Sequence, residues 1–234
     1  KTMDARARMV FDFNVNEGVN VMLGMTAHSD WDGPNTSDGA VDRYTVSAAN
    51  LLGDGGTFTL GTQYFTLGSG RIIGSDSWKN DQKTTSGIWY SNAGFNAFVL
   101  NGGDAAAVAA GTDGDDTFGV SFEYALAMPG LGDIAMSPYL IGTVNGDPGS
   151  TGFATDYYGS ELSGSAMGFG WTGEYANNDG NVAWTASTSI NIDALAAVPG
   201  ITGAALDLST SSADAGFDAS GATGWNQAGL VDSA

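Results

Sequence analysis

Cysteine is absent from the sequence of 234 residues, and positive charge is scarce. Without cysteine there can be no disulfide framework, thiol nucleophile, iron–sulfur cluster or cysteine-ligated zinc site. Only 7 Lys+Arg stand against 26 Asp+Glu, which gives a formal net charge of −19. Such a chain cannot neutralise a run of phosphates, which excludes nucleic acid as a partner. No stretch reaches about 18 consecutive apolar residues, so the sequence predicts no transmembrane helix, although the alternating strands of a membrane β-barrel are compatible with it.

Catalytic motifs are equally sparse. His28 is the only histidine, and no nucleophile motif or carboxylate partner accompanies it. The Gly-rich residues 53–56 lack the Lys-Ser/Thr of a phosphate-binding loop and are typical of a hairpin turn. Paired carboxylates can hydrolyse glycosides, but among 26 acids such pairs arise by chance. We therefore expect that the protein is not an enzyme. We also expect no cofactor, with Ca²⁺ in the extracellular loops as the one alternative.

Alternation of apolar and polar residues is the main signal that is present. In the first run one face has only apolar residues and the other has mostly polar ones; the apolar set is Ala7, Met9, Phe11, Phe13 and Val15. The same period of two recurs over residues 19–27, 117–126, 167–175 and 182–192. A period of two places one apolar and one polar face on each β-strand. The sequence therefore predicts an all-β chain.

The connections between these runs alternate in length. Short turns are predicted at residues 16–18, 51–56, 92–94, 129–133 and 176–181, with longer polar stretches at 29–41, 66–84, 101–116, 145–160 and 193–200. Tight turns at one rim and long loops at the other are typical of outer-membrane barrels, and a Greek-key sandwich has no reason to alternate so regularly. We predict one antiparallel up-and-down transmembrane β-barrel domain over residues 1–234, with about 10–12 strands.

The ends of this pattern depart from a usual barrel. If the short turns are periplasmic, the run over residues 6–15 descends toward the periplasm, so we expect an ascending strand before Lys1. The final segment, residues 210–234, is rich in Ala, Ser, Gly and Asp and closes without an aromatic strand. We infer that the sequence belongs to a larger barrel or has unusual ends.

Several segments carry a family resemblance. They begin at Arg6-Ala-Arg-Met-Val-Phe-Asp-Phe, continue through Leu60-Gly-Thr-Gln-Tyr-Phe-Thr-Leu-Gly-Ser-Gly-Arg-Ile-Ile-Gly, Trp78-Lys-Asn and Trp89-Tyr-Ser-Asn-Ala-Gly-Phe-Asn, and end with Leu162-Ser-Gly-Ser-Ala-Met-Gly-Phe-Gly-Trp. Together they resemble the alginate-export-like porins of Gram-negative outer membranes. The resemblance implies a larger barrel in the cell outer membrane, in contact with lipid and lipopolysaccharide. Thr62 stands where the family usually has arginine, and the scarcity of basic residues argues against an acidic polysaccharide as cargo.

The polar faces supply candidate pore-lining residues, because the polar face of a membrane barrel lines its lumen. These residues are Arg6, Arg8, Asp12, Arg43, Gln63, Glu123, Glu174 and Asp207. The resemblance adds Arg71, in the long stretch 66–84, near a constriction formed by an inward-folded loop; the alternative is a solvated extracellular loop with local ion pairs. A net-acidic lumen concentrates cations. We expect passive diffusion of small hydrophilic solutes or ions, with cations favoured, and a homo-oligomer as in many porins; the alternative is that the facing charges only pair in a filled lumen.

The long loops contain acidic clusters, and the strands contain many aromatics. Asp113, Asp115 and Asp116 are candidate Ca²⁺ ligands, although their spacing does not match an EF-hand loop. Aromatics near strand ends suit interfacial girdles, and we expect this of Trp31, Trp78, Trp89, Trp171, Trp184, Trp225, Tyr44, Tyr64, Tyr124, Tyr139 and Tyr175. A different class of function also fits: a surface-layer or extracellular β-protein whose acidic loops bind Ca²⁺ and support assembly. A surface glycosidase or lectin is a further alternative.

Overall fold

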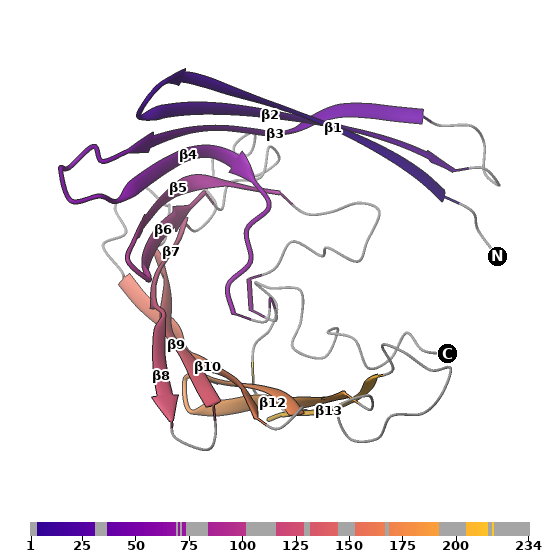
Figure 1. Cartoon of the computed structure of the whole chain (residues 1–234), viewed down its shortest axis with the longest axis vertical. Coiled ribbons are helices and arrows are strands. Elements are labelled where there is room, and N and C mark those ends of the chain that lie inside the picture. The colour runs from indigo at the N-terminus through magenta and orange to yellow at the C-terminus, as the bar shows by residue number, and fades with distance from the viewer. Residues whose placement is uncertain are drawn as a thin grey trace. The chain divides into compact units, whose positions relative to one another are not determined.

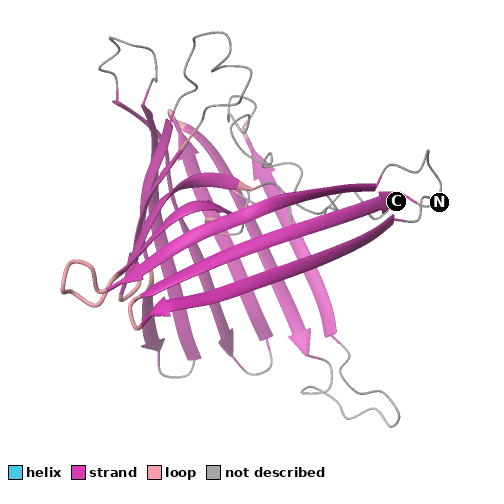
Figure 2. Ribbon diagram, turned by 90° about the horizontal axis from the view of Figure 1, so that it is seen from above, coloured by secondary structure: helices cyan, strands magenta, loops and turns pink. Residues whose placement is uncertain are grey.

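The computed structural model describes residues 4–30, 37–68, 70, 72–73, 84–101, 116–128, 132–144, 153–166, 169–191, 205–214 and 217. Strands account for 83% of these residues, and none of them is in a helix (Figure 2). Among these same residues there is accordingly no helix of sufficient length and apolarity to cross a membrane. The predicted all-β class is confirmed.

Thirteen strands follow one another along the chain (Figure 1). Their bounds are β1 Asp4–Asn16, β2 Val19–Asp30, β3 Ser37–Ala49, β4 Thr57–Gln63, β5 Thr85–Asn92, β6 Phe95–Leu100, β7 Asp116–Phe122, β8 Tyr124–Met128, β9 Gly132–Val144, β10 Phe153–Ala166, β11 Phe169–Asn178, β12 Asn181–Asn191 and β13 Ala205–Ala213. They form an antiparallel sheet in which each strand pairs with its neighbour in sequence, except that β7 and β8 both pair with β9. Because Glu123 alone separates β7 from β8, these two strands are one pass interrupted at that residue.

The predicted alternation of short and long connections is wrong in the last part of the chain. Strands β10 and β11 are joined by residues 167–168, and β11 and β12 by residues 179–180, so two short connections follow each other. The run predicted over residues 167–175 starts inside the first of these turns, across which the apolar face passes from even residue numbers, such as Leu162, to odd ones, such as Phe169. Part of the predicted loop 145–160 is strand β10, which begins at Phe153.

The other predicted short turns are confirmed as strand connections. In the β5–β6 turn both central residues have positive φ, 46° at Ala93 and 87° at Gly94, and the β11–β12 turn repeats this with 47° at Asp179 and 87° at Gly180. Positive φ at both positions defines the type I′ turn, whose twist matches that of the flanking strands. Local turn chemistry therefore sets the register of both hairpins.

The chain divides into two compact units. Unit 1 comprises Lys1–Thr66, Gly74–Phe118 and Thr143–Phe153, and unit 2 comprises Leu67–Ile73, Gly119–Gly142 and Ala154–Ala234. In unit 1, directly opposed residues of β1 and β2 are of one kind: Phe11 faces Leu23, Phe13 faces Val21, and Asn14 faces Asn20. Directly opposed residues in an antiparallel sheet share a face, so the two strands have one apolar and one polar face.

The apolar face is the exposed one in unit 1. Phe13 is 53% exposed, and large apolar residues are exposed on β3 to β6 as well: Tyr44, Val46, Leu60, Ile88 and Val99. The opposite face is better covered, since Thr45 in the middle of β3 is buried. This distribution is the reverse of that in a water-soluble sheet protein.

Unit 2 shows the same distribution. Its exposed apolar residues include Phe122, Leu126, Leu162, Tyr175, Trp184 and Leu208, the last of which is 52% exposed. On the other face, Glu174 is 3% exposed and Ala183 is 0% exposed. The polar faces of both units are therefore the places to look for a functional site.

Candidate functional site

A β-bulge in unit 1 places two charged side chains together. The β2–β3 register shifts between Gly24 and Met25, so that Asp42 is the extra residue beside Arg43. Bulges re-aim side chains and recur next to functional sites. Asp42 accepts a hydrogen bond from the Thr26 hydroxyl at 2.5 Å, which fixes its carboxylate on the polar face.

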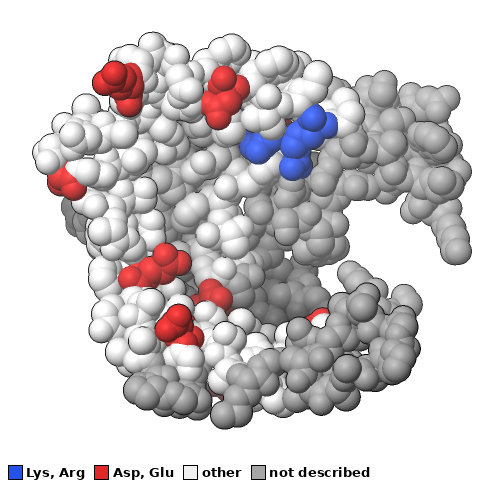
Figure 3. All heavy atoms as spheres, in the orientation of Figure 1, with Lys and Arg blue, Asp and Glu red and all other residues white. Residues whose placement is uncertain are grey.

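Tyr64 joins this bulge to the first strand. Its ring lies under two guanidinium groups, with Arg8 Cζ 4.8 Å and Arg43 Cζ 4.6 Å from the ring centre. Its hydroxyl donates to Asp42 Oδ2 at 2.6 Å and accepts from Arg8 Nη2 at 3.0 Å. Cation–π contacts of this kind contribute about 0.5–2 kcal/mol each. In the space-filling view the described Lys and Arg atoms gather in one place (Figure 3).

Arg43 is the most constrained member of this cluster. Its side chain is 13% exposed, and its Nε lies 3.7 Å from Asp42 Oδ1, which is too long for a hydrogen bond. Within the described part of the chain, neither Nε nor Nη2 has a hydrogen-bond partner. Glycine at position 24 leaves room for the guanidinium in this position, since an added Cβ there would lie 2.8 Å from Arg43 Nε. The structure thus brings Arg8 and Arg43 together, two residues that the sequence analysis named separately.

Unit 2 contains a cluster of carboxylates. Glu161 on β10 lies directly opposite Glu174 on β11, and Glu123 is near enough to act electrostatically on Glu161. Like charges directly opposed in a sheet are destabilising. Tyr139 relieves part of this by donating a hydrogen bond of 2.9 Å to Glu174 Oε1 in the buried interior. The opposed carboxylates and the buried Tyr139 hydroxyl form the candidate site of unit 2.

A short turn of the predicted loop 66–84 lies against these carboxylates. It is closed by a hydrogen bond from the Leu67 amide to the Ile73 carbonyl at 2.9 Å. A Cβ added at Gly68 would lie 2.9 Å from Glu174 Oε1 and 3.4 Å from Glu161 Oε2. The described part of the loop therefore reaches the polar face of β10 and β11.

Phe65, which precedes this turn in the sequence, lies on the polar face of unit 1. Phe65 packs on Trp89 and Phe98, with ring centres 5.9 Å and 4.8 Å apart, and both of these rings are buried. Trp89, Tyr64 and Tyr139 are thus engaged on polar faces, so their predicted place in an interfacial girdle is wrong. The period of two fits either face, and only the strand register decides which one an aromatic residue occupies.

The remaining predicted pore-lining residues are dispersed. Asp12 accepts a hydrogen bond from Asn20 Nδ2, Gln63 ends β4, and Asp207 lies on β13 in the wall of a cavity. The side chains of Arg6 and the residues Arg71, Asp113 and Asp115 lie outside the described part of the chain, whereas Asp116 begins β7. Among the described residues, no group of three or more His, Asp or Glu is arranged to hold a metal ion.

Four residues of these clusters were not predicted as site residues from the sequence: Asp42, Tyr64, Tyr139 and Glu161. Glu161 was within reach, because a turn at residues 167–168 pairs Ala166 with Phe169 and, five steps on, Glu161 with Glu174. No signal in the sequence could have placed Tyr64 between Arg8 and Arg43, which lie on other strands. Neither the protein-family models nor the curated proteins gave a match to this chain.

Proposed function

We propose that this protein is a porin-like channel of the Gram-negative outer membrane, which passes small hydrophilic solutes and ions by passive diffusion and favours cations. In this proposal the antiparallel sheet belongs to a closed transmembrane β-barrel. The apolar faces contact lipid and lipopolysaccharide, and the polar faces line a water-filled lumen. The resemblance to alginate-export-like porins stays a prediction.

The observation that supports this proposal is the reversed exposure of the two faces. In each unit large apolar side chains are exposed on strand after strand, while polar groups such as Thr45 in unit 1 and Glu174 in unit 2 are buried. A membrane barrel has this distribution because its outer band meets hydrocarbon. Soluble monomers rarely expose contiguous apolar patches above a few hundred Å².

The same observation argues against the surface-layer alternative. A β-sandwich buries the apolar face of one sheet against a second sheet. Within the described residues there is one sheet, and Phe13 and Leu208 on its apolar faces remain more than half exposed. The acidic loops that this alternative requires include Asp113 and Asp115, which lie outside the described residues.

The charge of the later strands supports a preference for cations. No lysine or arginine follows Lys83, so strands β5 to β13 contain none. On the polar face of unit 2, Glu161 and Glu174 are directly opposed. Carboxylates in a low-dielectric wall attract cations and repel anions.

Planar-bilayer conductance tests both parts of the proposal. The purified protein should form ion-conducting pores, and in a salt gradient the reversal potential should have the sign of cation preference. The variant Glu161→Gln/Glu174→Gln should shift that potential toward zero, because it removes two charges from the lumen. The control Glu17→Gln removes one charge from the exposed β1–β2 turn and should leave the potential unchanged. Absence of conductance refutes the channel, and anion preference refutes the acidic lumen alone.

A further inference from the structure

Two rows of polar residues cross strands β10 to β13 on the polar face of unit 2. The first row is Ser163, Thr172, Ser187 and Ser209, and the second is Ser165, Gly170, Ser189 and Asp207. Each residue is directly opposed to the next in its row, so all of them share one face. Neighbouring strands lie about 4.8 Å apart, so the first row presents one hydroxyl group on each of four successive strands, and the second row adds two hydroxyls and the carboxylate of Asp207.

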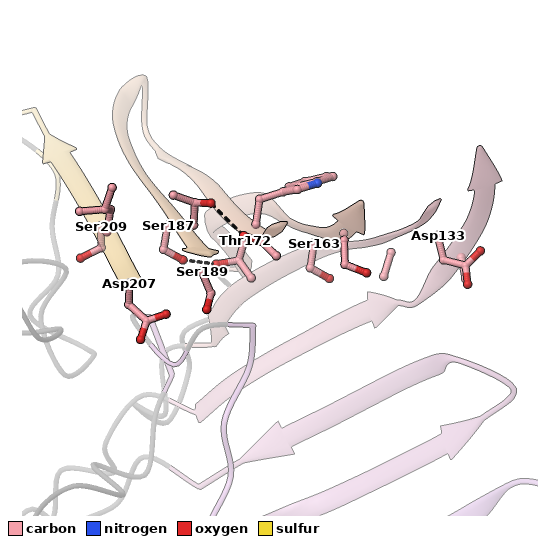
Figure 4. Close-up of a pocket in the computed structure, with 15 residues that line it drawn as sticks. Asp133, Ser163, Thr172, Ser187, Ser189, Asp207 and Ser209 are labelled. Carbon is pink, nitrogen blue, oxygen red and sulfur yellow. Dashed lines mark hydrogen bonds between the residues drawn. The ribbon is translucent and has the colours of Figure 1, made fainter. Parts of the chain in front are cut away.

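These rows line a cavity of about 600 Å³ (Figure 4). Thr172 and Ser187 hydrogen-bond to each other at 2.5 Å. The hydroxyls of Ser163, Ser189 and Ser209 have no side-chain partner among the described residues and are free to bond a ligand. The lining also contains the carboxylates of Asp133 and Asp207. Apolar residues such as Ala135, Trp171 and Leu208 make up much of the remaining lining. The cavity therefore combines apolar surface with hydroxyls that both donate and accept and with two carboxylates that only accept.

We propose that this cavity binds an uncharged polyhydroxy solute, namely a small neutral sugar, on its way through the pore; this inference rests on the proposed channel function. A hydroxyl group can satisfy a sugar hydroxyl in either direction, and the carboxylates of Asp133 and Asp207 accept further bonds from it. The same two carboxylates repel anionic sugars, and β8 to β13 have no cation to offset them. The volume is within the range of small-molecule sites, about 300–1,000 Å³.

The alternative ligand of this surface is a hydrated cation. Hydroxyls gain less from a cation than carboxylates do, and the two carboxylates that lie directly opposite each other in unit 2 are those of Glu161 and Glu174. The cavity walls contain neither of these two residues. The chemistry of the rows thus favours the neutral solute.

The test uses the full chain, purified in detergent, with maltotriose as the probe and calorimetric titration as the readout. Maltotriose should bind, and glucuronate, an anionic sugar, should not. The variant Ser163→Ala/Ser187→Ala/Ser209→Ala should weaken binding at least about tenfold, since it removes three hydroxyls that can bond the sugar. A matched control is Ser47→Ala/Thr59→Val, which removes another hydroxyl pair, bonded at 2.9 Å in unit 1, and should leave the affinity unchanged.

The outcomes separate this proposal from the channel itself. Conductance without maltotriose binding, or equal affinity in the triple variant, overturns the sugar site and leaves the channel standing. Binding that the triple variant weakens, in a protein that does not conduct, supports the site and refutes the channel. Tighter binding of glucuronate than of maltotriose also overturns the proposal of a neutral-sugar site. If the triple variant does not fold, the isosteric Thr172→Val replaces it, with a loss of at least twofold expected.

Discussion

Replacing Leu162 by arginine distinguishes a lipid-facing strand from a solvated one. Leu162 lies on β10, four residues before the strand ends at Ala166, and is 40% exposed. With a rise of about 3.4 Å per residue and a tilt of about 45°, it lies about 10 Å from the rim of an apolar band about 25 Å tall. That places it close to the middle of the bilayer, where arginine on the lipid face costs about 2–4 kcal/mol.

A solvated strand gives a different expectation. An arginine at an exposed position of a water-soluble protein changes the free energy of unfolding by no more than about 0.5 kcal/mol. The assay is reversible urea unfolding of the protein in lipid vesicles, followed by tryptophan fluorescence. Leu162→Arg should lower the free energy of unfolding by about 2–3 kcal/mol.

The neighbouring residue is the matched control. Ser163 is next in sequence, on the opposite face of the same strand, and lines the cavity. Ser163→Arg should cost under about 1 kcal/mol, because its charge remains in water. Equal effects of the two substitutions, or a change below about 0.5 kcal/mol for Leu162→Arg, would refute the assignment of the apolar face to lipid.

Three further substitutions test particular contacts. Gly24→Ala should lower the free energy of unfolding by about 1–3 kcal/mol in urea titrations, because the new Cβ would lie 2.8 Å from Arg43 Nε. Gly68→Ala should raise single-channel conductance, because its φ of +56° and the approach of its Cβ to within 2.9 Å of Glu174 Oε1 both drive the turn away from the carboxylates. Asp54→Asn should destabilise the protein at neutral pH, because the hydrogen bond that Tyr90 donates to Asp54 lowers the pKa of this carboxyl group. A carboxylate with a lowered pKa stabilises the folded state at pH values above the ordinary aspartate pKa of about 4. The difference in stability between wild type and variant should therefore shrink as the pH falls below that value.

Each of these has a contrary result. Gly170→Ala is the control for Gly24→Ala, because its nearest contact would be at 3.8 Å, and equal losses in the two variants would show that the contact with Arg43 is not the cause. Unchanged or lower conductance in Gly68→Ala would show that the turn does not narrow the path. If the difference in stability between wild type and Asp54→Asn persists at pH 3, the charged form of Asp54 is not its cause.

The sequence by itself determined the strands and their two faces. Alternation is a local property, so the apolar run from Ala7 to Val15 specifies an exposed or buried face before any partner strand is known. Turn residues such as Gly94 and Gly180 likewise act through their own backbone conformation. The pairing of Glu161 with Glu174 was also within reach, because register follows from the position of the turn.

The tertiary structure decided the contacts between residues that are far apart in sequence. Arg8, Arg43 and Tyr64 meet because a bulge in β3 and the chain after β4 converge on one polar face, and neither event follows from the period of two. The approach of Gly68 to the paired glutamates is of the same kind. Periodicity states which side of a strand a residue occupies, whereas the neighbours on that side depend on register and loop path, which are set by the packing of the folded chain.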